Sequence, residues 1–181
     1  MKIGAGAARG RNIVVPGGGR LRVTTDRVKE ALFNILGSLE GCRFLDIFAG
    51  SGSVGIEALS RGAGNAVFIE NNPRHVKTIK DNLLRCGFAS GYEILAISCD
   101  KGLAALSDGK RMFDVVFADP PYEKGLVAKS LERIGAAGII EPGGIVIVEH
   151  SVRECCAGGE GLVLEDQRRY GDTVLSFLAP Q

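Results

Sequence analysis

Phe44-Leu-Asp-Ile-Phe-Ala-Gly-Ser-Gly-Ser-Val-Gly55 is the stretch that decides the fold of this 181-residue chain. A short apolar run, Arg43–Ile47, passes directly into a glycine-rich turn, and Gly50, Gly52 and Gly55 satisfy the spacing G-x-G-x-x-G. That spacing is typical of a parallel strand followed by a ligand-binding turn and a helix. Alone it does not discriminate between the nucleotide-like ligands that use such a turn.

Six more short apolar runs alternate with segments of helical period, which predicts an α/β fold built from βαβ units. Asn72 as a cap and Pro73 as the first helical residue indicate one helix start. The last two runs are too close for a crossover helix, so they are expected to pair antiparallel. We predict a seven-stranded, mostly parallel sheet with an antiparallel C-terminal hairpin and helices on both faces. The six runs are Ala66–Glu70, Tyr92–Ser98, Phe113–Ala118, Ile145–Glu149, Leu162–Glu165 and Thr173–Leu178.

The composition is that of a folded globular protein, with 45% hydrophobic and 24% charged residues and a net charge of +1. No apolar run approaches the length of a membrane helix, and no secretion signal opens the chain, so no membrane partner is expected. Five cysteines without metal-ligand spacing indicate reduced thiols and no metal site. These features predict a cytoplasmic protein, and no long apolar surface stripe demands a partner, which favours a monomer.

The near-zero net charge hides a segregated distribution. Residues 1–30 hold seven basic and two acidic side chains, a net charge of +5 that the remainder balances with −4. We expect residues 1–40 to form a basic arm or hairpin and a first helix, packed on a main domain of residues 41–181 within a single globular unit. Thr25 or Asp26 can cap that helix. Its expected apolar face is Val28, Leu32, Ile35, Leu36 and Leu39, and the candidate phosphate contacts are Arg9, Arg11, Arg20, Arg22 and Arg27.

Three carboxylates help to decide which of the candidate ligands the glycine turn would bind. Asp46, Glu70 and Asp100 follow the first three predicted strands, whose carboxyl ends meet at one edge of a parallel sheet. An acid at Asp46 would repel a pyrophosphate. S-adenosylmethionine instead carries a ribose diol, a sulfonium and an ammonium, so the acids favour it over a nicotinamide dinucleotide.

The fourth predicted strand runs straight into Asp119-Pro-Pro-Tyr122. Two prolines cannot continue a strand ladder, so the strand is expected to stop there and leave a rigid rim. That rim offers a carboxylate, carbonyl oxygens and an aromatic face. Such a set can orient an exocyclic amine of a base and stack the base on Tyr122.

Asp46-x-Phe-x-Gly-x-Gly52 together with Asp119-Pro-Pro-Tyr122 resembles the S-adenosylmethionine-dependent N-methyltransferases. More narrowly, Thr24–Asn34, Arg9-Gly-Arg11 and Arg169–Thr173 resemble the bacterial 16S ribosomal RNA guanine-N(2) methyltransferases of the RsmD type. The resemblance implies a Rossmann-like class I methyltransferase fold and a guanine substrate in assembling or assembled small ribosomal subunits.

By position, the resemblance implies two sets of site residues. The target amine would lie against Asp119, Pro120, Pro121 and Tyr122. The methyl donor would be held by Asp46, Phe48, Ala49, Gly50, Gly52, Glu70, Asn71, Asp100 and Thr25.

Alternative functions stay open at this level. A related transferase could act on DNA adenine or on a protein glutamine. More remote hypotheses are a non-catalytic RNA-binding assembly factor, which would need neither motif, and an NAD-dependent reductase, which Asp46 disfavours.

Overall fold

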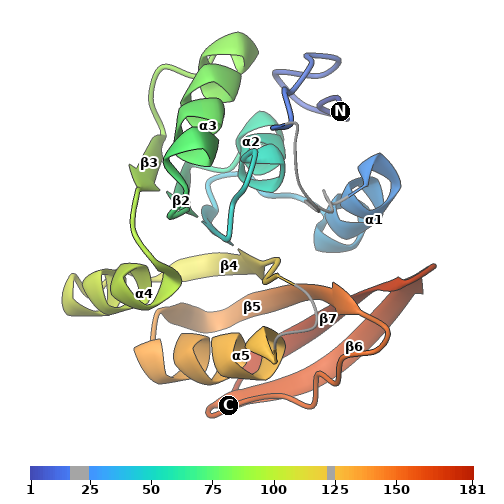
Figure 1. The fold of residues 1–181 in the computed structure, drawn as a ribbon, viewed down its shortest axis with the longest axis vertical. Helices are drawn as coiled ribbons and strands as arrows, with labels where there is room; N and C mark the ends of the chain where they lie inside the picture. Colours follow the sequence, from blue (N-terminus) through green and yellow to red (C-terminus); the bar gives the residue numbers. More distant parts are fainter. Residues whose placement is uncertain (17–24, 122–124) are drawn as a thin grey trace. The chain divides into compact units, whose positions relative to one another are not determined.

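The computed structural model describes residues 1–16, 25–121 and 125–181. Two compact units make up the chain, Met1–Ile97 and Ser98–Gln181 (Figure 1). The division expected after residue 40 falls inside the first unit, and it stays a prediction. The strand order is β3-β2-β1-β4-β5-β7-β6 in one seven-stranded sheet.

The first unit carries three parallel strands with helices between them. After α1 (Asp26–Leu36) the elements are β1 (Arg43–Ile47), α2 (Ser53–Ser60), β2 (Asn65–Ile69), α3 (Pro73–Cys86) and β3 (Tyr92–Leu95). β1 and β3 each pair with β2 in parallel register. Every residue of α2 is buried, because this helix packs against β1, β2 and α3 at once.

Local sequence accounts for the helix ends of this unit. The side chain of Asn72 accepts a hydrogen bond from the N–H of Arg74, with Pro73 as the first helical residue, and α3 ends at a left-handed Gly87. Thr25 caps α1 by accepting from the N–H of Val28. Both helix starts are therefore where the sequence predicts them.

The second unit is a mixed sheet with two helices. Its elements are α4 (Cys99–Asp108), β4 (Phe113–Ala118), α5 (Leu126–Ala137), β5 (Ile140–Ser151), β6 (Leu162–Tyr170) and β7 (Thr173–Pro180). β4 and β5 pair in parallel, whereas β7 pairs antiparallel with both β5 and β6. The predicted C-terminal hairpin is confirmed, and its strands are longer than the apolar runs that indicated it.

Several sequence expectations about local structure were wrong. The third strand ends at Leu95, not Ser98, and the fifth begins at Ile140, not Ile145. Ile35, expected on the buried face of α1, is 45% exposed, whereas Val28 and Leu32 are buried as expected and Lys29 and Phe33 are buried with them. Within the described residues, no helix combines the length and the apolar character that crossing a membrane requires.

Candidate functional site

The turn after β1 has an unusual backbone. Phe48, Gly50 and Gly52 all have positive φ angles, of 62°, 56° and 75°. A non-glycine residue such as Phe48 rarely adopts this conformation, and such strain gathers at functional sites. A Cβ atom added at Gly50 would meet only the carbonyl oxygen of Phe48, at 3.8 Å. Among the described residues, the space beside Gly50 is therefore open, and a ligand could approach the backbone there.

Glu70 follows β2 directly and holds this turn through its carboxylate. Its Oε2 accepts the N–H of Gly50 at 2.9 Å, and its Oε1 accepts the N–H of Asn72 at 2.8 Å. His75, in the first turn of α3, places its Nδ1 3.4 Å from the same Oε2. A carboxylate has about four acceptor positions. Glu70 is thus fixed in orientation, with acceptor capacity left for the hydroxyls of a ligand.

Sequence reasoning did not include His75, although its place in the first turn after an acidic strand end was visible. Asn71, which was included, is exposed beside Glu70.

Asp46 is almost completely buried, with 2% of its surface exposed. Burial raises the pKa of its carboxyl from 3.8 to about 8, the N–H of Gly55 opposes this with a 2.9 Å hydrogen bond to Oδ2, and the Glu70 charge adds to it. Asp46 therefore holds a proton at neutral pH. The sequence argument treated Asp46 as an anion facing a cationic ligand, whereas burial favours the neutral form of its carboxyl.

Gly55 explains why α2 can approach the strands so closely. A Cβ atom at this position would lie 2.3 Å from Cε1 of Phe68 in β2 and 3.1 Å from Oδ2 of Asp46. The third glycine of the motif is thus required by helix–strand packing.

Asp100 does not stand at a strand end as expected. It lies in the first turn of α4, is exposed, and forms an ion pair with Arg133 of α5. The reason for the difference is that β3 stops four residues before Cys99, so Asp100 belongs to the next helix. Thr25, which was also predicted to bind the methyl donor, caps the N-terminus of α1.

The Asp-Pro-Pro-Tyr element follows β4 without a gap, because the strand ends at Ala118. Asp119 is half-buried, Pro120 is buried and Pro121 is exposed. Tyr122 lies outside the described residues. The predicted stop of the strand before two prolines is confirmed.

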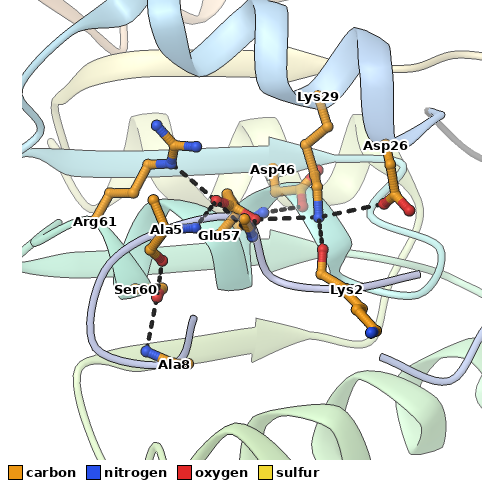
Figure 2. A network of polar contacts seen from close by, with 11 residues as sticks. Lys2, Ala5, Ala8, Asp26, Lys29, Asp46, Glu57, Ser60 and Arg61 are labelled. Carbon is orange, nitrogen blue, oxygen red and sulfur yellow. Dashed lines mark hydrogen bonds and ion pairs between the residues drawn. The ribbon is translucent and has the colours of Figure 1, made fainter. Parts of the chain in front are cut away.

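A buried ionic network fastens the N-terminal arm, residues 1–16, to α2 (Figure 2). Glu57 is fully buried, and its carboxylate accepts the N–H groups of Gly4 and Ala5. Lys29 of α1 and Arg61 lie 3.1 Å and 2.9 Å from its oxygens. Burial alone would raise the pKa of Glu57, but the Gly4 hydrogen bond and the two cations outweigh it and lower that pKa.

Because of this network, not all basic side chains of residues 1–30 are available to bind a partner. Lys29 is 2% exposed and donates to the carbonyl of Lys2, so it faces inward. Arg9, Arg11 and Arg27 are exposed, and Arg11 donates to the carbonyl of Arg85. Arg20 and Arg22 lie outside the described residues.

The structure thus joins some of the predicted site residues by hydrogen bonds and separates others. In the first unit, one hydrogen bond joins Gly50 to Glu70 and another joins Gly55 to Asp46, whereas Asp100 and Asp119 belong to the second unit. In the described ranges, no three histidine, cysteine, aspartate or glutamate side chains gather in a way that could hold a metal ion.

Comparison with known proteins places this chain among its relatives. The model of the family "Conserved hypothetical protein 95" matches residues 1–179. Ribosomal RNA small subunit methyltransferase D of Haemophilus influenzae is 36% identical over 82% of this chain and 78% of its own. The Escherichia coli K12 protein of the same name is also 36% identical, over 84% and 75%.

A solved structure shares the fold across the whole chain. A hypothetical protein of Thermus thermophilus superposes with a TM-score of 0.86 at 32% identity, covering 98% of both chains. The glycine turn, the strand order and these matches agree with the Rossmann-like class I methyltransferase fold predicted from the sequence. The chain belongs to the conserved hypothetical protein 95 family, which is the RsmD-type family of ribosomal RNA methyltransferases.

Proposed function

We propose that this protein transfers a methyl group from S-adenosylmethionine to the exocyclic N2 amine of a guanine in 16S ribosomal RNA. The observation that carries the proposal is the placement of Asp119-Pro120-Pro121 directly after β4 in a chain of this family. The names of its relatives support ribosomal RNA of the small subunit as the substrate. We propose that this RNA is modified in assembling or assembled particles.

The glycine turn and Glu70 fit the methyl donor. The open space beside Gly50 would admit the donor next to the backbone, with Phe48 and Ala49 in the same turn. The fixed carboxylate of Glu70 would accept the two ribose hydroxyls, with Asn71 beside it. When bound, the donor supplies an electrophilic methyl group on a sulfonium sulfur.

The role of Asp46 changes with its protonation. As a neutral carboxyl it holds the N–H of Gly55 and fixes the first turn of α2. A cation brought near it would favour the ionised form. In the second unit Asp100 is the candidate for the adenine amine, which would have to compete with Arg133 for its carboxylate.

Residues of the second unit would orient the N2 amine of the guanine for methyl transfer. The lone pair of a guanine N2 is delocalised into the ring, so acceptors on its two hydrogens must orient it before it can attack a methyl group. The Asp119 carboxylate and the carbonyl at Pro120 would serve as these acceptors, and Tyr122 would stack on the base. Holding the amine in line with the methyl group supplies much of the rate enhancement by proximity.

The basic arm would bind the RNA backbone. Arg9, Arg11 and Arg27 are exposed, and we assign Arg20 and Arg22 to the same role from their sequence position. Contacts of this kind neutralise phosphates without reading bases, so they make affinity depend on salt.

Calorimetry with S-adenosylhomocysteine and with NADH tests the donor assignment. We expect S-adenosylhomocysteine to bind and NADH not to bind comparably, because the turn lacks any lysine or arginine between Leu45 and Ser60 to offset a pyrophosphate. Binding of NADH alone would overturn the proposal.

Asp119→Ala tests the assignment of the amine site. Methyl transfer to small-subunit RNA should fall at least about a hundred-fold, while affinity for S-adenosylhomocysteine stays within a few-fold. Asp108→Ala is the matched control, since Asp108 is an exposed aspartate of the same unit. Equal loss of donor binding and transfer would contradict the role given to Asp119.

A further inference from the structure

Asn82 of α3 is fully buried, and within the described part of the chain its carboxamide bonds to backbone atoms of two distant segments. Its Oδ1 accepts the N–H of Val14 at 2.9 Å, and its Nδ2 donates to the carbonyl of Val14 at 2.8 Å. The same Nδ2 donates to the carbonyl of Ser51 at 2.9 Å. Both amide hydrogens and the acceptor are therefore used, as a buried amide requires.

The two segments that Asn82 joins have different roles in the proposed function. Ser51 lies in the glycine turn between Gly50 and Gly52, where the donor would bind. Val14 lies in the N-terminal arm, which carries Arg9 and Arg11. Asn82 is 31 residues from Ser51 and 68 from Val14 along the chain, so no local backbone effect connects them.

The contact with Ser51 bears directly on the conformation of the turn. The carbonyl of Ser51 and the N–H of Gly52 belong to one peptide group, and that N–H donates to the carbonyl of Ala49 at 2.7 Å. Fixing the Ser51 carbonyl therefore fixes the peptide plane that leads into the left-handed Gly52. Next to it, the N–H of Gly50 is held by Glu70.

We propose that Asn82 is a positioning residue that couples the order of the donor turn to the order of the N-terminal arm. If the Ser51 carbonyl turns away, Nδ2 loses one of its two acceptors, and the carboxamide, left with its bonds to Val14 alone, is held less firmly in the orientation that Val14 needs. Ordering either segment thus favours the other, and by linkage RNA bound on the arm and donor bound in the turn raise each other's affinity by the same factor. The coupling rests on the proposed function, because it assumes that the donor occupies this turn.

Other contacts of the arm reach α2 and not the turn. Ser60 accepts the N–H of Ala8 and donates to the carbonyl of Ala5, and Glu57 holds Gly4 (Figure 2). Ser60→Ala therefore loosens the arm without touching Ser51. It is the matched control for substitutions of Asn82.

Hydrogen exchange at the Val14 amide tests the coupling in the unmodified protein. Saturating S-adenosylhomocysteine should slow this exchange about five-fold or more, a typical size for coupling between sites. Unchanged exchange in a protein that calorimetry shows to bind S-adenosylhomocysteine would overturn the coupling and leave the proposed function intact. Failure to bind S-adenosylhomocysteine at all would instead count against the proposed function.

Substitutions of Asn82 test whether the coupling between the donor turn and the arm depends on this residue. Asn82→Ala removes all three hydrogen bonds, and Asn82→Asp keeps the acceptor for Val14 but has no donor for Ser51. Both should weaken S-adenosylhomocysteine binding about five-fold or more and abolish the donor-dependent protection of Val14. Ser60→Ala leaves the three hydrogen bonds of Asn82 in place, so it should retain the donor-dependent protection of Val14. Donor-dependent protection that persists in folded Asn82→Ala would refute the assignment, and if the Asn82 variants do not fold, the wild-type exchange experiment decides alone.

Discussion

Asp46→Asn should remove most of the pH dependence of stability that a buried carboxyl imposes on this protein. Asp46 is 2% exposed, and its burial raises the pKa from 3.8 to about 8. The native state therefore binds a proton that the unfolded chain releases above about pH 4. Between these two pH values the unfolded state binds fewer protons, so the free energy of unfolding falls as pH rises.

The size of the change in the free energy of unfolding follows from the interval between the unfolded-state and folded-state pKa values of Asp46. Each pH unit removes about 1.4 kcal/mol, so the contribution lost between pH 3.8 and pH 7 amounts to about 4 kcal/mol. Above pH 8 the loss levels off, because Asp46 is then ionised in both states. An asparagine keeps an oxygen to accept the N–H of Gly55 and has no proton to lose, so the variant lacks this slope.

Urea denaturation of both proteins from pH 5 to pH 9 measures the effect. The free energy of unfolding of the variant minus that of the wild type should rise by about 1.4 kcal/mol per pH unit up to about pH 8 and then become flat. Asp108→Asn, at an exposed aspartate, should give a flat difference throughout. Parallel curves for wild type and Asp46→Asn would refute the reasoning that Asp46 is protonated in the native state.

Three further variants test the packing of α2, the buried network around Glu57 and the RNA contacts of the arm. Gly55→Ala should lower the free energy of unfolding by about 1–3 kcal/mol in urea titrations, because its Cβ would lie 2.3 Å from Cε1 of Phe68; unchanged stability would contradict that packing. Glu57→Gln should lower the free energy of unfolding by about 3–5 kcal/mol at pH 7, because the buried Lys29 loses its nearer carboxylate and keeps only that of Asp26, at 4.0 Å, among the described residues. The wild-type contribution of the Glu57 charge, whose pKa is lowered, should vanish as the pH falls through that lowered pKa, and an effect that is the same at all pH values would argue against it. Replacing Arg9 and Arg11 together with glutamine should weaken RNA binding and reduce the slope of log affinity against log salt by about 2; an unchanged slope would show that these arginines do not contact phosphates.

Strands and helix starts could be predicted from sequence where a local signal sufficed. β1 and β4 have the predicted bounds, Arg43–Ile47 and Phe113–Ala118, because each is a short apolar run with a clear stop after it. Asn72-Pro73 fixed the start of α3 in the same way. Asp100 was misplaced because the third strand was predicted to continue to Ser98, whereas it ends at Leu95 and Asp100 lies in α4.

The polar interior of the first unit could not be predicted. Glu57 and Asn82 look like ordinary polar positions on helices, yet both are fully buried and hydrogen-bonded to the N-terminal arm, more than fifty residues away in sequence. Likewise, the proton on Asp46 arises from complete burial beside Glu70, which the order of residues does not reveal. Tertiary packing decides both features.

Methyl transfer to guanine N2 in small-subunit RNA can be measured directly. The protein is incubated with S-adenosylmethionine labelled in the methyl group and with small ribosomal subunits whose RNA lacks the modification. Ribosomal RNA, DNA and protein serve as separate substrates in parallel. After digestion, we expect the label in N2-methylguanosine from 16S RNA, and we expect Asp119→Ala to abolish it. Label in a DNA adenine or a protein glutamine, or no transfer to any pool, would contradict it.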